Sequence, residues 1–290
     1  MARLWSPKFF LIGATLVALL MFTHDARAWD SHTHQLITRL AVETLPSSSL
    51  REGLQSHERA LEEYSIEADT VLKARYGRSE QIRHYLDLEE FGTDPFSKLS
   101  PDFAAMKRRY GDQRLERSGT LPWTIEAYAQ AVAADARARD CNALIRDAGY
   151  LAHYVGDASM PLHSTRFYDG YTYADRGVHA RIEGAADDYV GEIAATARPG
   201  LHTVNIDSVW APVLSEIKDA NSHVTEVIDA DREVRAAEPR SRAGYDRAIA
   251  QRELAMISRQ VASAASLLAS IWLLEWHNAG NPQVCSEKSG

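Results

Sequence analysis

The chain has 290 residues and a net charge of −8, with 45% hydrophobic residues and only two cysteines. Such a charge is not typical of a protein that binds nucleic acid backbones through basic patches. The length is enough for one large domain that buries roughly three quarters of its unfolded surface.

The first 28 residues have the three parts of a secretory signal. These are basic Arg3 and Lys8, an apolar stretch over residues 9–22, and the small-x-small cleavage site Ala26-Arg27-Ala28. The apolar stretch rises only about 21 Å as a helix, less than a hydrocarbon core of about 30 Å, and we expect no other stretch to span a membrane. We therefore expect residues 29–290 to be exported, to the periplasm or outside the cell. Cleavage removes three positive charges and one negative, which leaves −10.

Apolar residues recur at helical spacing along most of the remaining chain, and no run alternates with period two. The first expected helix begins at His34 and ends at Pro46. Further helices are expected over residues 123–139, 141–157, 180–197, 209–231 and 245–277. Two long loops, 91–122 and 160–178, separate some of them, and loops of this length are usually functional or mobile. The pattern predicts one all-α domain over residues 29–290.

Two histidine and carboxylate pairs occur at helical spacing. Residues four apart lie on one face of a helix, so His153 and Asp157 can bind one metal together, as can His179 and Glu183. An exposed hydrogen-bonded pair is the simpler interpretation of either spacing. However, His153 and Asp157 end an otherwise apolar helix, where unpaired polar groups are costly, and metal coordination would compensate for that cost.

Further residues that could bind a metal lie upstream. Asp69 and His84 are candidates, with Glu67 and Asp87 as competing carboxylates. Nitrogen and carboxylate oxygen are the usual zinc ligands besides thiolate. Spacing alone does not choose among the carboxylates.

The expected cleavage would also create a ligand. It exposes the amine of Trp29 as a new N-terminus, five residues before His34. His32 is an alternative to His34, and spacing does not separate the two. The mature N-terminus is therefore a candidate third contribution to a metal site.

Taken in chain order, these residues stand in recognisable motifs. The motifs are Trp29 with His34, Ala68-Asp69, His84-Tyr85-Leu86-Asp87, His153-Tyr154-Val155-Gly156-Asp157 with Met160-Pro161-Leu162-His163, and Gly177-Val178-His179-x-x-x-Glu183. Together they resemble the zinc-dependent phospholipase C and single-strand nuclease superfamily. By motif the resemblance covers residues 29–183, followed by a helical remainder.

The resemblance implies an all-helical domain with three zinc ions in a cleft. It implies one zinc held by Asp69, His84, His153 and Asp157, a second held by His163, His179 and Glu183, and a third held by the amine and carbonyl of Trp29 with His34 and a bridging Asp157. The implied reaction is phosphodiester hydrolysis by a zinc-activated water. We assign Asp69 a second role, orienting or deprotonating that water. Three zinc ions would also make the site cationic within an acidic protein, so the global charge does not exclude a phosphate substrate.

Local features favour the phospholipase branch over the nuclease branch. The Gly-x-His-x-x-x-Glu pattern that ends at Glu183 is similar to the phospholipases, whereas the nucleases usually have Asn-Leu-His followed by Trp-Asp. Leu72 stands where nucleases tend to have Arg, with Lys73 and Arg75 nearby, and the loop before His179 is short and lacks Gly-Gly-Asn. The close spacing of the N-terminal motif is nuclease-like. A phospholipid headgroup is the predicted substrate, with transient membrane contact, and single-stranded DNA or RNA is the alternative.

Three tyrosines in the second loop are candidates for substrate binding. Tyr168, Tyr171 and Tyr173 could surround a choline ammonium through cation–π contacts or stack on a base. The simpler interpretation is that they anchor the loop.

Two other questions concern the cysteines and the class of metalloprotein. Cys141 and Cys285 are compatible with one disulfide in an oxidising compartment, although spacing does not establish it. A carboxylate-bridged di-iron bundle would need repeated Glu-x-x-His pairs, which are missing at matching positions. A non-catalytic metal-binding protein would lack one of the implied ligands, and none is missing.

Overall fold

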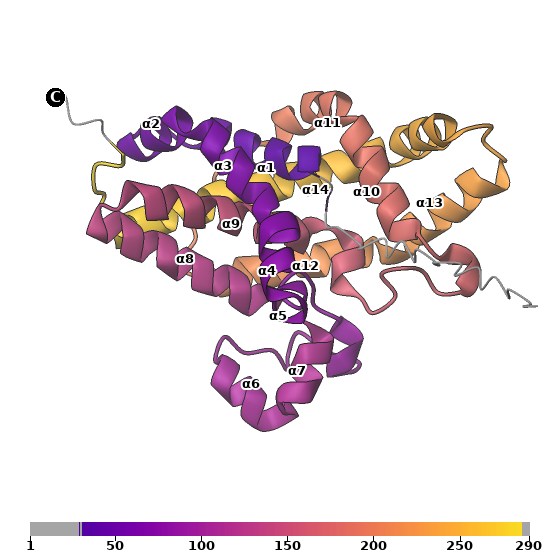
Figure 1. The fold of residues 1–290 in the computed structure, drawn as a ribbon, viewed down its shortest axis with the longest axis horizontal. Helices are drawn as coiled ribbons and strands as arrows, with labels where there is room; N and C mark the ends of the chain where they lie inside the picture. Colours follow the sequence, from indigo (N-terminus) through magenta and orange to yellow (C-terminus); the bar gives the residue numbers. More distant parts are fainter. Residues whose placement is uncertain (1–28, 30, 286–290) are drawn as a thin grey trace, which may run out of the picture.

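The computed structural model describes Trp29 and residues 31–285, so the expected secretory signal at 1–28 lies outside the described residues (Figure 1). The described chain is predominantly helical, and no β-strand occurs within it. The all-α fold class expected from the sequence is confirmed.

The described chain up to Ser159 contains nine α-helices, and residues 82–102 separate the fifth from the sixth. They are α1 (Ser31–Thr44), α2 (Ser49–Ser56), α3 (Glu58–Glu67), α4 (Lys73–Tyr76), α5 (Arg78–Gln81), α6 (Phe103–Tyr110), α7 (Asp112–Ser118), α8 (Leu121–Ala138) and α9 (Cys141–Ser159). A π-helical turn, Ala68–Leu72, joins α3 to α4, and a 3-10 turn occupies Leu88–Phe91.

The second half adds five α-helices and three 3-10 turns. The helices are α10 (Val178–Asp188), α11 (Val190–Ala197), α12 (Trp210–Ser222), α13 (Val224–Ala236) and α14 (Arg242–Asn278). The 3-10 turns are Pro161–Ser164, Tyr173–Asp175 and Arg198–Gly200.

The core is built around α14. This helix of 37 residues runs along the long axis of the molecule and packs against α1 and α8 through α13 (Figure 1). It is long and apolar enough to cross a membrane, which corrects the expectation that no stretch beyond the signal has that length. However, 78% of its apolar window is buried inside the protein. Burial of this extent is typical of the central helix of a compact domain.

Two helices expected to be continuous are each divided. The predicted helix 180–197 breaks at Tyr189, and the predicted helix 209–231 breaks at His223. Neither Tyr189 nor His223 is a glycine or a proline, so the sequence contains no helix-terminating residue at either break and the apolar pattern predicted continuous helices. In both cases the change of direction lets the two segments pack separately on α14, and this tertiary packing outweighs local propensity.

The other predicted helices match the structure within a few residues, and α9 occupies the interior. It packs against α1, α3, α8, α12 and α14. The loop expected over 91–122 contains α6 and α7, which lie apart from the main body in Figure 1. A disulfide joins Cys141 at the start of α9 to Cys285 beyond α14, and so resolves the question that spacing left open.

Candidate metal centre

Four histidines surround the carboxylate of Asp157. Its Oδ1 atom lies 3.6 Å from His34 Nε2 and 3.5 Å from His163 Nδ1. Its Oδ2 atom lies 3.1 Å from His84 Nδ1 and 3.4 Å from His153 Nε2. Asp157 is fully buried, so each of its two oxygens faces a different pair of imidazoles. This is the arrangement that a bridging ligand requires.

Asp69 lies at the edge of this cluster, on the π-helical turn. Its Oδ1 atom is 3.5 Å from His84 Nδ1 and 3.8 Å from His153 Nε2, and it also pairs with the ammonium of Lys73. Burial alone would raise the pKa of Asp69, but His153, His84 and Lys73 together lower it. Single π-helical turns inside longer helices occur frequently at functional sites. Asp69 is therefore an ionised carboxylate beside the buried imidazoles.

A second cluster contains the pair predicted on one helix face. His179 Nε2 lies 2.7 Å from Glu183 Oε1, and both side chains are buried on α10. His163 Nε2 approaches the pair at 3.0 Å from His179 Nε2 and 3.6 Å from Glu183 Oε1. Because His163 also faces Asp157, the two clusters are continuous.

Backbone carbonyls fix the orientation of two of the rings. His153 Nδ1 donates to the carbonyl of Ser65 at 2.7 Å, and His163 Nδ1 donates to the carbonyl of His84 at 2.6 Å. A carbonyl only accepts, so each Nδ1 carries the proton and each neutral ring turns its Nε2 lone pair into the cluster. Metal-binding histidines are usually oriented in this way.

A buried carboxylate that the sequence motifs do not include, Glu80, lies behind His84. Its Nδ1 faces the cluster, and its Nε2 lies 3.5 Å from Glu80 Oε1. Glu80 is held in turn by the hydroxyl of Tyr154 and by Arg83 at 3.3 Å. The four-residue spacing of Glu80 and His84 was a signal that could have found it, since the same spacing drew attention to His153 and Asp157.

The donor set fits zinc by three observations. Two ligands of one tetrahedral zinc stand about 3.3 Å apart, and two nitrogen pairs, His163 with His179 and His84 with His153, face each other at 3.0 Å. Both ring nitrogens of His34 and Oδ1 of Asp157 are buried without a hydrogen-bond partner among the described residues.

The protonation state of the buried histidines is the third observation. Burial is the largest cause that holds the pKa values of His34, His84 and His163 well below the usual range, and neighbouring imidazoles lower the pKa values of all three further. The rings are therefore neutral at neutral pH. Metal coordination requires neutral imidazole, so the cluster is prepared for a cation.

The structure also separates the alternatives at the N-terminal end. His34 is buried beside Asp157, whereas His32 is largely exposed and lies 3.5 Å from Asp187. Trp29 is buried, and its indole donates to Ser159 Oγ at 3.2 Å, two residues beyond Asp157 on α9. This contact holds the start of the described chain against the helix that carries the cluster.

The competing carboxylates take other positions. Glu67 accepts a hydrogen bond from the hydroxyl of Tyr150 at 2.8 Å. Asp87 lines a neighbouring cavity and belongs to none of the groups whose ligand atoms converge. Those groups contain all eight side chains expected from the sequence as ligands, which are His34, Asp69, His84, His153, Asp157, His163, His179 and Glu183.

A cavity of about 940 Å³ opens onto the clusters and is lined by His84, His163 and His179. Of the three candidate tyrosines, only Tyr168 lines it. The hydroxyl of Tyr171 bonds to Thr225 at 2.9 Å, and Tyr173 is 83% exposed. The folded loop therefore places Tyr168 on the cavity and Tyr171 and Tyr173 outside its lining.

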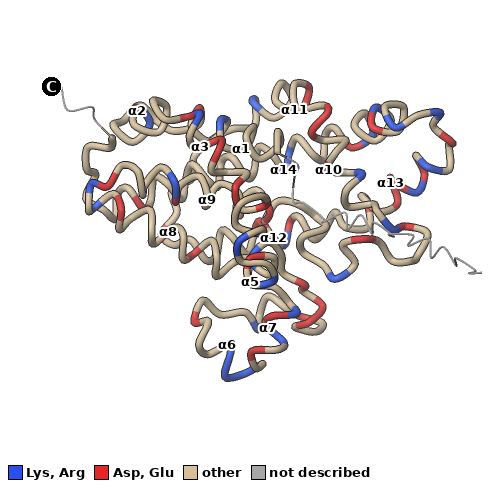
Figure 2. The backbone as a smooth tube through the Cα atoms, in the orientation of Figure 1, with Lys and Arg blue, Asp and Glu red and all other residues tan. Residues whose placement is uncertain are grey.

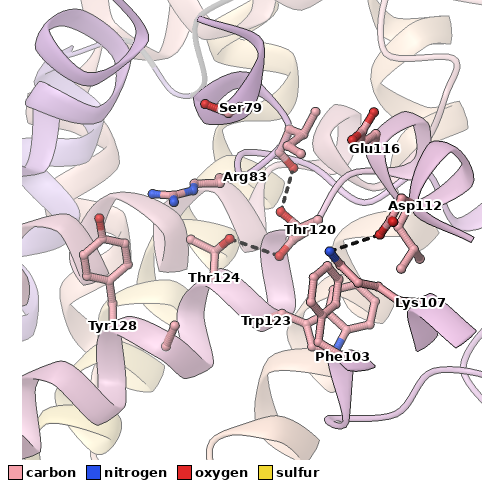
Figure 3. Close-up of a pocket in the computed structure, with 13 residues that line it drawn as sticks. Ser79, Arg83, Phe103, Lys107, Asp112, Glu116, Thr120, Trp123, Thr124 and Tyr128 are labelled. Atoms are coloured by element: carbon pink, nitrogen blue, oxygen red, sulfur yellow. Dashed lines mark hydrogen bonds and ion pairs between the residues drawn. The ribbon is translucent and has the colours of Figure 1, made fainter. Parts of the chain in front are cut away.

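A second cavity of about 470 Å³ is lined by Arg83, Trp123 and Tyr128, among other residues (Figure 3). Its rim contains an ion pair between Lys107 and Asp112 at 3.0 Å, and Thr124 donates to the carbonyl of Thr120 at 3.1 Å. No candidate metal ligand lines this second cavity. The metal chemistry belongs to the larger one.

The clustered histidines and carboxylates of this all-helical fold are a candidate metal centre, and comparison with known proteins identifies the family. The profile of the family described as zinc dependent phospholipase C matches residues 33–227, and the chain belongs to this family. Among solved structures, the alpha toxin from Clostridium absonum is similar, with 14% sequence identity and a TM-score of 0.48 over 92% of this chain and 67% of that chain. No curated protein sequence matches.

Proposed function

We propose that the protein is a zinc-dependent phospholipase C, which hydrolyses a phospholipid to diacylglycerol and a phosphorylated headgroup. The family match supports the reaction, and the observation that carries the proposal is the convergence of four imidazoles on Asp157 beneath the larger cavity. When bound, zinc would supply a Lewis acid for the phosphodiester and a water of lowered pKa.

We propose three zinc ions and assign their ligands as follows. The first site is Asp69, His84, His153 and Asp157, the second is His163, His179 and Glu183, and the third is His34, Asp157 and the amine and carbonyl of Trp29. Each group except the terminal amine and carbonyl is supported by the distances above.

Asp69 is the residue that we propose to orient the attacking water and accept its proton. Its side chain is 8% exposed, whereas that of Asp157 is fully buried, so a water reaches Asp69 more readily. Its lowered pKa keeps it ionised at neutral pH. Lys73 pairs with the same carboxylate and holds its direction.

We further propose that residues 1–28 are a cleaved secretory signal and that the mature protein acts in the periplasm or outside the cell. An α-amine has a pKa near 8 and binds metal once deprotonated, whereas an amide nitrogen is a poor ligand. Proteins that begin at Trp29 and at Ala28 should both fold, but the longer one should bind one zinc less tightly. Equal zinc content and equal rates would contradict the role of the terminal amine.

The decisive assay compares two substrates with zinc-loaded protein that begins at Trp29. We expect hydrolysis of phosphatidylcholine or another phospholipid with release of diacylglycerol, and we expect Asp157→Asn to abolish it. Rapid degradation of single-stranded DNA with no lipid cleavage under the same conditions would establish the nuclease alternative instead.

A further inference from the structure

Three arginines line the larger cavity without an acidic partner. Arg78, Arg117 and Arg176 all border it, and none of them makes an ion pair with a carboxylate in the described part of the chain. By contrast, Arg181 and Arg232, outside this lining, pair with buried aspartates at 2.7 Å. The cavity therefore contains guanidinium charge that the protein itself does not neutralise.

Neutral groups hold Arg78 in place. Its guanidinium donates to the hydroxyl of Tyr85 at 2.9 Å, to the carbonyl of Glu116 at 3.0 Å and to Gln81 Oε1 at 3.1 Å. The bond to Glu116 also places Arg78 next to the backbone of Arg117. Because these acceptors are uncharged, they fix the direction of Arg78 and leave its charge available to a ligand.

The acidic residues of the cavity are largely engaged elsewhere. Figure 2 shows acidic and basic residues side by side around α5 and α7. The net charge of the cavity therefore depends on which of these residues form ion pairs, and not only on how many of each there are. Glu90 lies 3.9 Å from Arg114, whereas Asp169 accepts only the neutral backbone N–H of Gly177 at 2.5 Å and keeps its charge.

Asp87 is the remaining carboxylate of the lining. Burial, followed by the nearby Glu89 and Glu90, raises the pKa of Asp87 to about 7. It therefore carries only part of a negative charge at neutral pH. The three positive charges of Arg78, Arg117 and Arg176 exceed the full negative charge of Asp169 and the partial charge of Asp87 together.

The cavity also lacks the aromatic surroundings that a quaternary ammonium needs. The guanidinium of Arg232 lies 5.7 Å from the ring centroid of Tyr171, and that of Arg176 lies 5.1 Å from the ring centroid of Tyr173. Tyr168 is the one tyrosine of the predicted trio in the lining. Tyr85 also lines the cavity, but the guanidinium of Arg78 lies 5.9 Å from its ring centroid. Tyr168 is then the one tyrosine of the lining whose ring has no arginine over it, and one ring does not form a cage for choline.

We infer that the cavity takes a headgroup with a second anionic group, a phosphate or a carboxylate, beyond the scissile phosphodiester, and that Arg78, Arg117 and Arg176 bind this group. Guanidinium forms paired, charge-assisted hydrogen bonds with both kinds of oxyanion. The inference rests on the proposed phospholipase function, because hydrolysis beside the zinc ligands is what places a headgroup in this cavity.

The test uses short-chain lipids below their micelle concentration, so that membrane surface charge does not contribute. The substrates are phosphatidylinositol 4-phosphate, phosphatidylserine and phosphatidylcholine, which distinguish a second phosphate and a carboxylate from a choline. We expect kcat/KM for at least one anionic headgroup to exceed that for choline by about tenfold or more. Calorimetry should likewise show tighter binding of inositol 1,4-bisphosphate or phosphoserine than of phosphocholine.

Variants assign the effect to the arginines. Arg117→Ala and Arg176→Ala should each lower kcat/KM for the preferred anionic lipid roughly tenfold to hundredfold, mainly through KM, and change phosphatidylcholine hydrolysis less than twofold. Arg259→Ala removes an exposed cation of α14 outside the cavity and serves as the control with the same charge change.

Two results would overturn the inference in distinguishable ways. Efficient phosphatidylcholine hydrolysis, with anionic lipids no better and no effect of the arginine variants, would refute the headgroup assignment and leave the phospholipase function intact. Degradation of single-stranded DNA without cleavage of any lipid would refute both, and the arginines would then serve nucleic acid phosphates.

Discussion

A methyl group added at Gly156 is expected to displace His34, one of the candidate metal ligands. Gly156 lies on α9 one residue before Asp157, against α1. A methyl group placed on Gly156 would meet His34 Nδ1 at 2.8 Å and His34 Cε1 at 3.0 Å. His34 has little room to retreat, because its ring stacks on that of His153 with 4.0 Å between the ring centroids.

The size of the effect of Gly156→Ala follows from these distances. Ordinary contact begins at 3.4 Å, so His34 Nδ1 must move by about 0.6 Å relative to α9. Overpacking a well-packed core costs about 1–3 kcal/mol, while replacing a helical glycine with alanine recovers about 0.5–1 kcal/mol. We expect a net loss of about 1–2 kcal/mol in the free energy of unfolding. A displacement of this size should also reduce activity by tenfold or more.

Two glycines provide matched controls for the same substitution. A methyl group on Gly191 of α11 meets nothing within 4 Å, so Gly191→Ala should leave stability equal or higher. A methyl group on Gly149 of α9 meets Tyr64 Cβ at 2.4 Å, so Gly149→Ala should destabilise the fold without altering metal content. Urea unfolding and elemental analysis of all three variants make the comparison. If Gly156→Ala and Gly149→Ala lose the same stability and keep the same zinc content, the coupling of Gly156 to His34 is wrong.

The remaining predictions concern the disulfide, the carboxylate behind His84 and the buried imidazoles. Replacing Cys141 and Cys285 with alanine opens a link across 144 positions and should lower the free energy of unfolding by up to about 5 kcal/mol in denaturant titrations, with zinc content unchanged. Glu80→Gln should weaken zinc binding about tenfold to hundredfold in chelator competition, because a neutral amide no longer supports His84, whereas the buried control Glu216→Gln on α12 should not. Burial, followed by Lys73, lowers the pKa of His179 to about 4, so metal-free protein should lose stability as the pH falls below about 6.5. Between pH 7.5 and pH 5, the free energy of unfolding of the metal-free protein should fall by about 2 kcal/mol more than that of the His179→Gln variant. If the two free energies fall in parallel with pH, the lowered pKa of His179 is wrong.

The sequence predicted that the candidate ligands would lie close together, because helix geometry is local. The pairs His153 with Asp157 and His179 with Glu183 needed only the rise and turn of a helix to be placed on one face. His163 lies in the 3-10 turn that directly follows α9, so the short connection keeps it close to His153 and Asp157. The distant members, His34 and His84, were identified by motif resemblance, and the structure brings both to Asp157.

Features that depend on tertiary packing were not predictable in this way. Glu80 supports His84 only because Tyr154 of the distant helix α9 holds it in place. Tyr171 and Tyr173 looked equivalent to Tyr168 by spacing, but the 3-10 turn at Tyr173–Asp175 directs them to Arg232 and Arg176 instead. The rival histidines His32 and His34 differ by two positions, which on a helix means different faces, and the sequence did not show where the helix begins.

The position of the metal centre on α9 divides that helix into two functional parts. Its first half buries apolar side chains such as Leu144, Ile145 and Leu151 in the common core, while its last turns carry His153 and Asp157. The disulfide fixes the apolar end, and α14 packs along the same helix. Because buried core residues such as Tyr154 and Val155 lie on the same turns as the candidate ligands, removal of zinc should leave the fold in place while exposing the cost of the buried, unpartnered imidazole of His34. The packed helices therefore position the candidate ligands close together in the metal-free protein.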